Sequence, residues 1–151
     1  MIDSELPMTI PAMVADSAAR YESHPAVVTG REIVTYRQLD DLVRRWSRAY
    51  IAQGVRHGDR VAVWAPNRLE FILAMLGAQS VGAAVVPLNT RFTGPEAKVI
   101  MERSGASVPV VDDSFLGRGF SHLLTQAAGG EGGPSGGPIA ASRPCRSATT
   151  V

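Results

Sequence analysis

The sequence of 151 residues is poor in several residue types, and each shortage excludes a class of function. Its single cysteine, Cys145, cannot build a disulfide framework or a cysteine zinc site. The three histidines, His24, His57 and His122, are far apart and lack the spacing of metal ligands, so we expect no metal site. No apolar run is long enough to span a membrane.

An excess of charge of one sign is also missing. The 15 basic and 14 acidic residues leave a net charge of +1 at pH 7, which favours neither nucleic acid nor an anionic membrane as a partner. Lys98 is the only lysine. The stretch from Met1 to Pro11 carries two acidic residues and no apolar signal core, so we expect a cytoplasmic protein.

The residues that are present predict four helices within one domain. A helix from Pro11 to about Tyr21 comes first. The other three begin at capping boxes, in which a Ser, Thr or Asn cap is followed three positions later by Glu or Gln. The predicted caps and partners are Thr35 with Gln38, Asn67 with Glu70, and Thr93 with Glu96. These three helices are expected to end at Gly54, at Val81 and near Gly105.

Short β-rich runs lie between the helices. Arg60–Ala65, Ala83–Leu88 and Val108–Val111 are almost continuously apolar, as parallel strands covered on both faces tend to be. Val27–Val28 and Ile33–Tyr36 predict an antiparallel hairpin on the edge. The predicted fold is therefore α/β: a small, open, mostly parallel sheet with βαβ crossovers, an edge hairpin and helices on both faces.

The composition divides the chain into a domain, 1–126, and a tail, 127–151. The tail is rich in Gly, Pro, Ala and Arg and has almost no large apolar side chains. Because such a segment cannot offset its ordering entropy by burial, we predict that it is disordered. Two origins stay open for it, a flexible linker and out-of-frame translation of a GC-rich gene.

Several single residues are explained by structure as well as by function. Trp46 and Trp64 are predicted to lie in the core. Asp59 follows a glycine before a strand, where a carboxylate that stabilises a turn is expected rather than a general base.

Polar side chains that follow the predicted strands are the other candidates. Asp112 and Asp113 end a strand and are expected to start a turn or cap a helix, with cation binding as the alternative. Asn67 and Asn89 also follow strands and could face a ligand crevice, although Asn67 is already explained as a helix cap.

An ordered set of motifs between about Met8 and about Phe115 resembles the N-terminal part of an AMP-forming acyl-CoA synthetase. Residues 35–39 are similar to the TYxEL segment of that family, and 54–62 to its GVxxGDRVA segment. Residues 66–71 are similar to the PNxxEF pair, and 82–91 to GAxxVPLNxR. Thr93, Glu96 and the run 104–106 complete the set, and the form of 87–91 is most similar to bacterial fatty-acyl or related carboxylate CoA ligases.

The resemblance implies an enzyme that uses ATP and Mg²⁺ to convert a carboxylic acid, such as a fatty acid, to an acyl-adenylate, which CoA then attacks. In that family a Gly-rich loop ending in Pro-Lys-Gly binds the phosphates, and a lysine in a C-terminal domain assists the first step. Neither motif occurs here, because Lys98 is in neither context. We therefore expect no catalytic residue, no metal and no bound cofactor on this chain alone.

One residue is carried over from the family as a ligand contact. The resemblance implies that Arg91 contacts the phosphates of CoA, which a guanidinium suits because it stays charged and binds bidentately. The alternative is that Arg91 caps or pairs within the loop before the helix at Thr93.

Three functions remain open at this point. The chain is the N-terminal part of a CoA ligase that needs a separately encoded remainder, a non-catalytic α/β module that binds a nucleotide or a protein, or a non-functional truncated gene product. If further structure normally covers this domain, the chain alone exposes apolar surface to solvent. We expect the helix Leu69–Val81, which is apolar on nearly all sides, to be the source of that surface. We then expect self-association and marginal stability.

Overall fold

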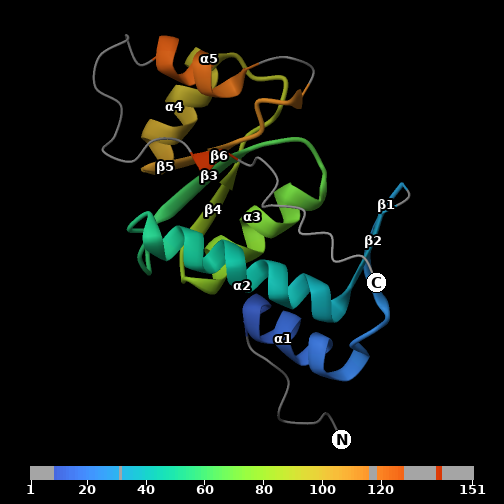
Figure 1. Cartoon of the computed structure of the whole chain (residues 1–151). Coiled ribbons are helices and arrows are strands. Elements are labelled where there is room, and N and C mark those ends of the chain that lie inside the picture. The colour runs from blue at the N-terminus through green and yellow to red at the C-terminus, as the bar shows by residue number, and fades with distance from the viewer. Residues whose placement is uncertain (1–8, 31, 116–118, 128–138, 141–151) are drawn as a thin grey trace, which may run out of the picture.

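The central feature of the computed structural model is a parallel sheet with the strand order β4-β3-β5-β6 (Figure 1). The structure describes residues 9–30, 32–115, 119–127 and 139–140. Its elements are α1 (Ile10–Tyr21), β1 (Pro25–Thr29), β2 (Glu32–Thr35), α2 (Tyr36–Ala52), β3 (Arg60–Trp64), α3 (Leu69–Ser80), β4 (Ala84–Pro87), α4 (Gly94–Ser104), β5 (Val108–Val111), α5 (Phe120–Ala127) and β6 (Ile139–Ala140).

Strand β3 lies at the centre because it pairs in parallel with β4 on one side and with β5 on the other. Its side chains alternate between two cores. Val61 and Val63 belong to one cluster, whereas Ala62 and Trp64 belong to the other. The four positions are fully buried or nearly so, which explains why the strand is continuously apolar. The predicted α/β fold with βαβ crossovers is confirmed.

Helices cover both faces of the sheet, as predicted. Helices α2 and α3 pack on the face of Val61 and Val63, and α1 packs on these two helices (Figure 1). Helices α4 and α5 pack on the opposite face, where Phe120 is fully buried. This division follows from right-handed crossovers, since the chain moves one way from β3 to β4 and the opposite way from β4 to β5.

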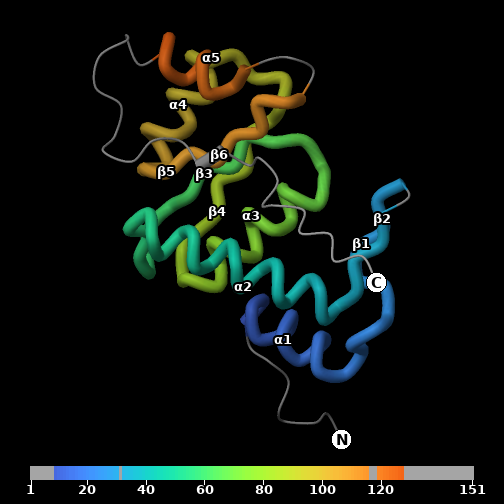
Figure 2. The backbone as a smooth tube through the Cα atoms, in the orientation of Figure 1, coloured from blue at the N-terminus to red at the C-terminus, as the bar shows by residue number. Residues whose placement is uncertain are grey.

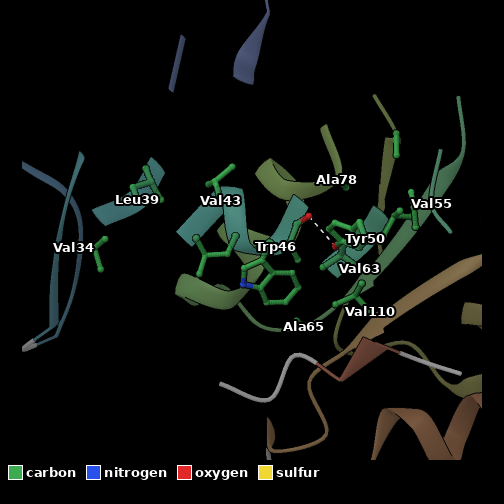
Figure 3. Close-up of a cluster of buried hydrophobic side chains, with 14 residues drawn as sticks. Val34, Leu39, Val43, Trp46, Tyr50, Val55, Val63, Ala65, Ala78 and Val110 are labelled. Carbon is green, nitrogen blue, oxygen red and sulfur yellow. Dashed lines mark hydrogen bonds between the residues drawn. The ribbon is translucent and has the colours of Figure 1, made fainter. Parts of the chain in front are cut away.

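The core between α2, α3 and the sheet contains one of the two tryptophans (Figure 3). Trp46 is buried, and the hydroxyl of Tyr50 donates a hydrogen bond to the carbonyl of Ala74 at 3.0 Å. The two helices approach closely at Gly77, where an added Cβ would lie 2.7 Å from the Cβ of Trp46. Trp64 is also fully buried, so both predicted core tryptophans are confirmed.

Two of the three predicted capping boxes are confirmed. Thr35 and Thr93 each accept a hydrogen bond from the backbone three residues later, and Gln38 and Glu96 reach back to the cap. The left-handed Gly105, with φ of 68°, ends α4 as expected.

The box predicted at Asn67 is wrong. The cap of α3 is Arg68, and no side-chain hydrogen bond caps the helix. The turn after β3 uses one residue more than the sequence pattern suggested, because the N–H of Arg68 donates to the carbonyl of Pro66 at 2.8 Å. Asn67 is exposed on this turn.

The predicted hairpin forms from β1 and β2, but it is a separate two-stranded sheet and does not lie on the edge of the parallel sheet. The 17 residues of α2 separate it from β3. A helix of that length spans about 25 Å. Figure 2 shows the hairpin beside the N-terminal end of α2, away from the parallel strands.

The predicted disordered tail, 127–151, lies almost entirely outside the described residues. Ala127 is the last residue of α5, and Ile139–Ala140 pair in parallel with Val110 and Val111. At these two positions the structure has a strand where the sequence predicted no ordered element. Backbone pairing with the free edge of β5 accounts for it, because a ladder needs no pattern of buried side chains.

Candidate functional site

The carboxyl edge of the parallel sheet is the first candidate site. The chain leaves β3 toward α3 on one face, and it leaves the neighbouring β5 toward α5 on the other face. In open α/β sheets, ligands bind where the loops after two adjacent strands diverge in this way. Arg68 follows β3 and Asp112 follows β5, so both lie at this point.

Arg68 and Asp112 bridge the two diverging loops. The Nη1 of Arg68 lies 3.5 Å from Oδ2 of Asp112, whose side chain is 8% exposed. The guanidinium also lies over the ring of Phe115, 5.7 Å from its centre. The other oxygen of Asp112 accepts hydrogen bonds from the N–H and hydroxyl of Ser114. Because both oxygens are engaged, Asp112 holds a turn, as the sequence predicted for this position.

Asp113 has the second role that was predicted for these two carboxylates, which is to cap a helix. Its carboxylate accepts hydrogen bonds from the N–H and the hydroxyl of Ser121, in the first turn of α5. Asp59 likewise stabilises a turn, because its Oδ2 accepts from the N–H of Arg56 at 2.7 Å. These carboxylates are therefore explained by local structure.

The loop after β4 is held in place by a hydrogen bond from Trp64 of the central strand β3. The indole Nε1 of Trp64 donates to the carbonyl of Asn89 at 2.9 Å, and the Trp64 ring stacks on Phe120 with 4.4 Å between centroids. The side-chain oxygen of Asn89 accepts from the N–H of Arg91 at 2.9 Å. Asn89 therefore sets the backbone direction at Arg91 and is not free to bind a ligand through that oxygen.

Arg91 is exposed at the same edge of the sheet. Within the described residues its guanidinium takes part in no ion pair, whereas its backbone is held by Asn89. The suggested pairing of its side chain within the loop is thus not observed in that part of the chain. Contact with a phosphate of CoA stays a prediction.

The single lysine is occupied elsewhere. The Nζ of Lys98 donates to the carbonyl of Ala127 at 3.1 Å and lies 3.7 Å from the carboxylate of Glu102. It therefore joins α4 to the end of α5 and does not point to the loops after the strands. Lys98 and Asp112 are therefore both engaged in contacts within the protein.

The histidines lie on three different parts of the fold. His24 precedes β1, His57 lies beside Gly82 before β3, and His122 contacts Gln126 on α5. In the residues that the structure describes, no group of three or more His, Cys, Asp or Glu side chains could hold a metal ion. Cys145 lies outside the described residues. None of the described helices is long and apolar enough to cross a membrane.

A second candidate is a groove that we call the hairpin groove, between β2, the first half of α2 and the start of α3. It encloses about 350 Å³. Its walls are apolar and its rim is charged. The lining residues are Glu32, Ile33, Val34, Gln38, Asp41, Leu42, Arg45, Leu69, Glu70 and Leu73.

The apolar surface of helix α3 is only partly covered. None of its large hydrophobic side chains is among the most exposed of the described residues, but Leu69, Phe71, Ile72, Met75 and Leu76 each stay partly exposed, so its expected role as the source of uncovered surface stays a prediction. The sheet, α1 and α2 enclose it on several sides. The large hydrophobic side chains that are most exposed in the described residues are Ile10, Met13, Tyr21, Val28, Ile33, Ile51 and Val99.

Sequence reasoning missed Arg68 altogether and missed the hairpin groove. The available signal for Arg68 was weaker than that for Asp112, because Asp112 directly follows β5 whereas three residues separate Arg68 from the end of β3. For the groove no local signal exists, because its walls come from three elements that only the fold brings together.

Comparison with known proteins gives a consistent result. Residues 14–134 match the family described as AMP-binding enzyme. A 3-[(3aS,4S,7aS)-7a-methyl-1,5-dioxo-octahydro-1H-inden-4-yl]propanoyl:CoA ligase from Rhodococcus jostii is 41% identical over 114 residues, which are 76% of this chain and 22% of the relative. A long-chain-fatty-acid–CoA ligase from Escherichia coli is 37% identical over 105 residues, which are 68% of this chain and 18% of the relative.

A solved structure extends the likeness to three dimensions. The N-terminal domain of FACL13 from Mycobacterium tuberculosis superposes with a TM-score of 0.73 at 29% identity. The match covers 89% of this chain and 33% of that domain. The chain therefore spans about a fifth of the two curated relatives and a third of one solved N-terminal domain.

Proposed function

The chain belongs to the AMP-binding enzyme family, and from that premise we propose that it is the N-terminal part of an ATP-dependent acyl-CoA ligase which works only with the rest of the enzyme. The likeness that supports the proposal is the 41% identity to a CoA ligase, confined to 22% of that relative. A relative named for long-chain fatty acids and one named for a ring-bearing propanoyl group both act on carboxylic acids. We therefore propose a carboxylic acid with a large apolar part as the substrate.

The proposed reaction has two steps. The carboxylate attacks the α-phosphorus of ATP, which forms an acyl-adenylate and releases pyrophosphate. The thiol of CoA then attacks the acyl carbon, so that a thioester forms and AMP leaves. Mg²⁺ belongs to the proposal because the triphosphate needs charge neutralisation in the first step.

The chain alone is proposed to be inactive. Its single lysine pairs with Glu102 and with the end of α5, and the sequence contains no Thr-Gly-x-Pro-Lys-Gly loop. The groups that bind the triphosphate are therefore proposed to come from a downstream polypeptide. To the proposed enzyme, this chain contributes the parallel sheet, the loops after β3, β4 and β5 that side-chain contacts hold in place, and the cationic side chain of Arg91.

Arg91 is proposed to bind a phosphate of CoA. Its guanidinium is exposed at the carboxyl edge of the sheet, while Asn89 holds its backbone in place. A fixed backbone and a guanidinium that forms no ion pair within the described residues suit bidentate contact with a phosphate that arrives from solvent.

Co-expression tests the proposed function. This chain is produced together with the Rhodococcus jostii ligase from which the matching region has been removed, and acid-dependent pyrophosphate release is measured with ATP and Mg²⁺. We expect release from the mixture and none from either polypeptide alone. Arg91→Ala should raise the KM for CoA about tenfold and leave adenylate formation unchanged. A mixture with no acid-dependent release contradicts the proposal.

A further inference from the structure

The β1–β2 hairpin is apolar on both faces. Val27 pairs with Val34, and this pair packs against the core, where Val34 is 6% exposed. Val28 pairs with Ile33 on the opposite face, where the two residues are 62% and 57% exposed. An antiparallel pair with one face in solvent normally alternates apolar and polar residues. The outer face of this hairpin therefore has the composition of a covered surface.

The hairpin also lacks neighbours in the plane of its sheet. Within the described residues, β1 and β2 pair only with each other. Isolated two-stranded hairpins are marginally stable, and free strand edges are sites for the addition of a further strand. Backbone hydrogen-bonding groups are thus available beside the apolar pair of Val28 and Ile33.

The hairpin groove continues the same surface. Ile33 belongs to both, and Leu42, Leu69 and Leu73 form the apolar wall behind it. Figure 3 places Val34 apart from the rest of the labelled core, on the hairpin strand at one end of the cluster. The surface therefore offers a free strand edge next to a recess lined by leucines.

Charge on the rim of the groove is mostly negative. The charged residues that line it are three acidic ones, Glu32, Asp41 and Glu70, and one arginine, Arg45. In the described part of the chain, none of these four side chains forms an ion pair. A partner that covers the groove gains most if it carries basic side chains around an apolar one.

We propose that the outer face of the hairpin and the hairpin groove form the surface on which the downstream part of the ligase docks. The occupant is an extended segment that adds a strand to the hairpin edge, places an apolar side chain in the groove and sets Lys or Arg against the acidic rim. This inference rests on the proposed function. It is supported by the solved N-terminal domain that this chain matches, of which 33% is covered, so that two thirds of that domain has no counterpart here.

The test compares two exposed isoleucines during co-expression with the Rhodococcus jostii ligase that lacks the matching region. Ile33→Glu alters the proposed surface. Ile51→Glu is the matched control, because Ile51 is 63% exposed near the end of α2 and lines neither the groove nor the hairpin. Recovery of the complex on a tag carried by this chain should fall about tenfold for Ile33→Glu and stay unchanged for Ile51→Glu.

A second variant separates docking from folding. Val28→Thr with Ile33→Thr keeps β-branched residues in both strands and removes only apolar surface, so the hairpin should form while docking weakens. Thermal unfolding of each isolated variant confirms that the domain is folded.

The outcomes distinguish this inference from the proposed function. An active complex that tolerates every hairpin variant overturns the docking surface and leaves the proposed function intact. A failure to form any complex or activity overturns both. If Ile33→Glu instead abolishes a concentration-dependent dimer of this chain, measured by light scattering, the occupant is a second copy and the proposed docking of the downstream part of the ligase is wrong.

Discussion

Arg68 and Asp112 lie 44 residues apart in the sequence and meet at 3.5 Å, which ties the loop after β3 to the loop after β5. These loops lead to helices on opposite faces of the sheet, so the pair holds the point where the two layers separate. Asp112 is buried and Arg68 is half exposed. The carboxylate is therefore the partner whose removal should matter more.

Asp112→Ala is expected to destabilise the domain. The substitution removes the ion pair with Arg68 and leaves the N–H and hydroxyl of Ser114 without their acceptor. The expected loss is about 2 kcal/mol in the free energy of unfolding by urea. Asp41→Ala is the control, since that exposed carboxylate forms no ion pair in the described residues and should change stability by less than about 0.5 kcal/mol. Equal effects at the two positions would contradict the assigned role.

The two buried tryptophans should respond differently to replacement by phenylalanine. Trp64 donates a hydrogen bond to the carbonyl of Asn89, whereas the indole nitrogen of Trp46 has no partner in the described structure. Trp64→Phe therefore removes a hydrogen bond as well as ring volume and should cost about 2–4 kcal/mol. Trp46→Phe should cost about 1 kcal/mol less, because it also removes an unpaired donor. Chemical denaturation decides the order, and the reverse order would refute the explanation.

Gly77→Ala separates packing from helix propensity. Alanine in place of glycine inside a helix is worth about 1 kcal/mol by propensity alone, which predicts a more stable protein. The new Cβ would lie 2.7 Å from the Cβ of Trp46, so α2 and α3 must move apart. We expect a net loss of about 1–3 kcal/mol. Ser80→Ala, at the exposed end of the same helix, should be close to neutral. A Gly77→Ala variant with a higher melting temperature would contradict the close approach.

The two capping boxes should differ in their response to pH. The carboxylate of Glu96 accepts hydrogen bonds from the backbone N–H and from the hydroxyl of Thr93. Both hydrogen bonds lower the pKa of the Glu96 carboxyl, and the one from the backbone N–H contributes more. A carboxyl with a lowered folded-state pKa stabilises fully above its unfolded pKa, and the contribution is lost as pH falls through the folded pKa. The box of Thr35 uses the neutral Gln38 and has no such dependence.

Threonine-to-alanine substitutions at both caps measure this difference. Thr35→Ala should cost about 1 kcal/mol at every pH. Thr93→Ala should lower the free energy of unfolding by less at about pH 3 than near pH 7. The reason is that the carboxyl of Glu96, which pairs with Thr93 in the wild-type box, loses its charge as the pH falls. Urea midpoints at the two pH values give the comparison. A cost of Thr93→Ala that does not vary with pH would show that the charge on Glu96 plays no part.

The parts of the fold that the sequence predicted are those with local causes. The boxes at Thr35 and Thr93 depend on residues three positions apart, and β3 is recognised by its continuous apolar run. Asn67 and Glu70 have the same spacing, yet α3 begins after Arg68 without a side-chain cap. A local pattern could not reveal this, because the side chain of Arg68 is directed to Asp112 on a distant loop.

The candidate site was predicted only where a motif named a residue. Arg91 was found through a resemblance, and its exposure and fixed backbone emerged only from the structure. The position of the hairpin was missed because the sequence of two short strands does not specify whether they pair with the parallel sheet or only with each other. The outward pair of Val28 and Ile33 follows from the strand register, which a single short strand does not specify.

The most direct measurement of the central claim is pyrophosphate release by this chain alone. The purified chain is incubated with ATP, Mg²⁺ and a set of fatty and aromatic acids, with a sample without protein as the control. The account predicts no release above that control, because the only lysine is engaged with α5 and no phosphate-binding loop is present in the sequence. Acid-dependent turnover by the chain alone would contradict the account and would mean that this sheet binds ATP by other residues.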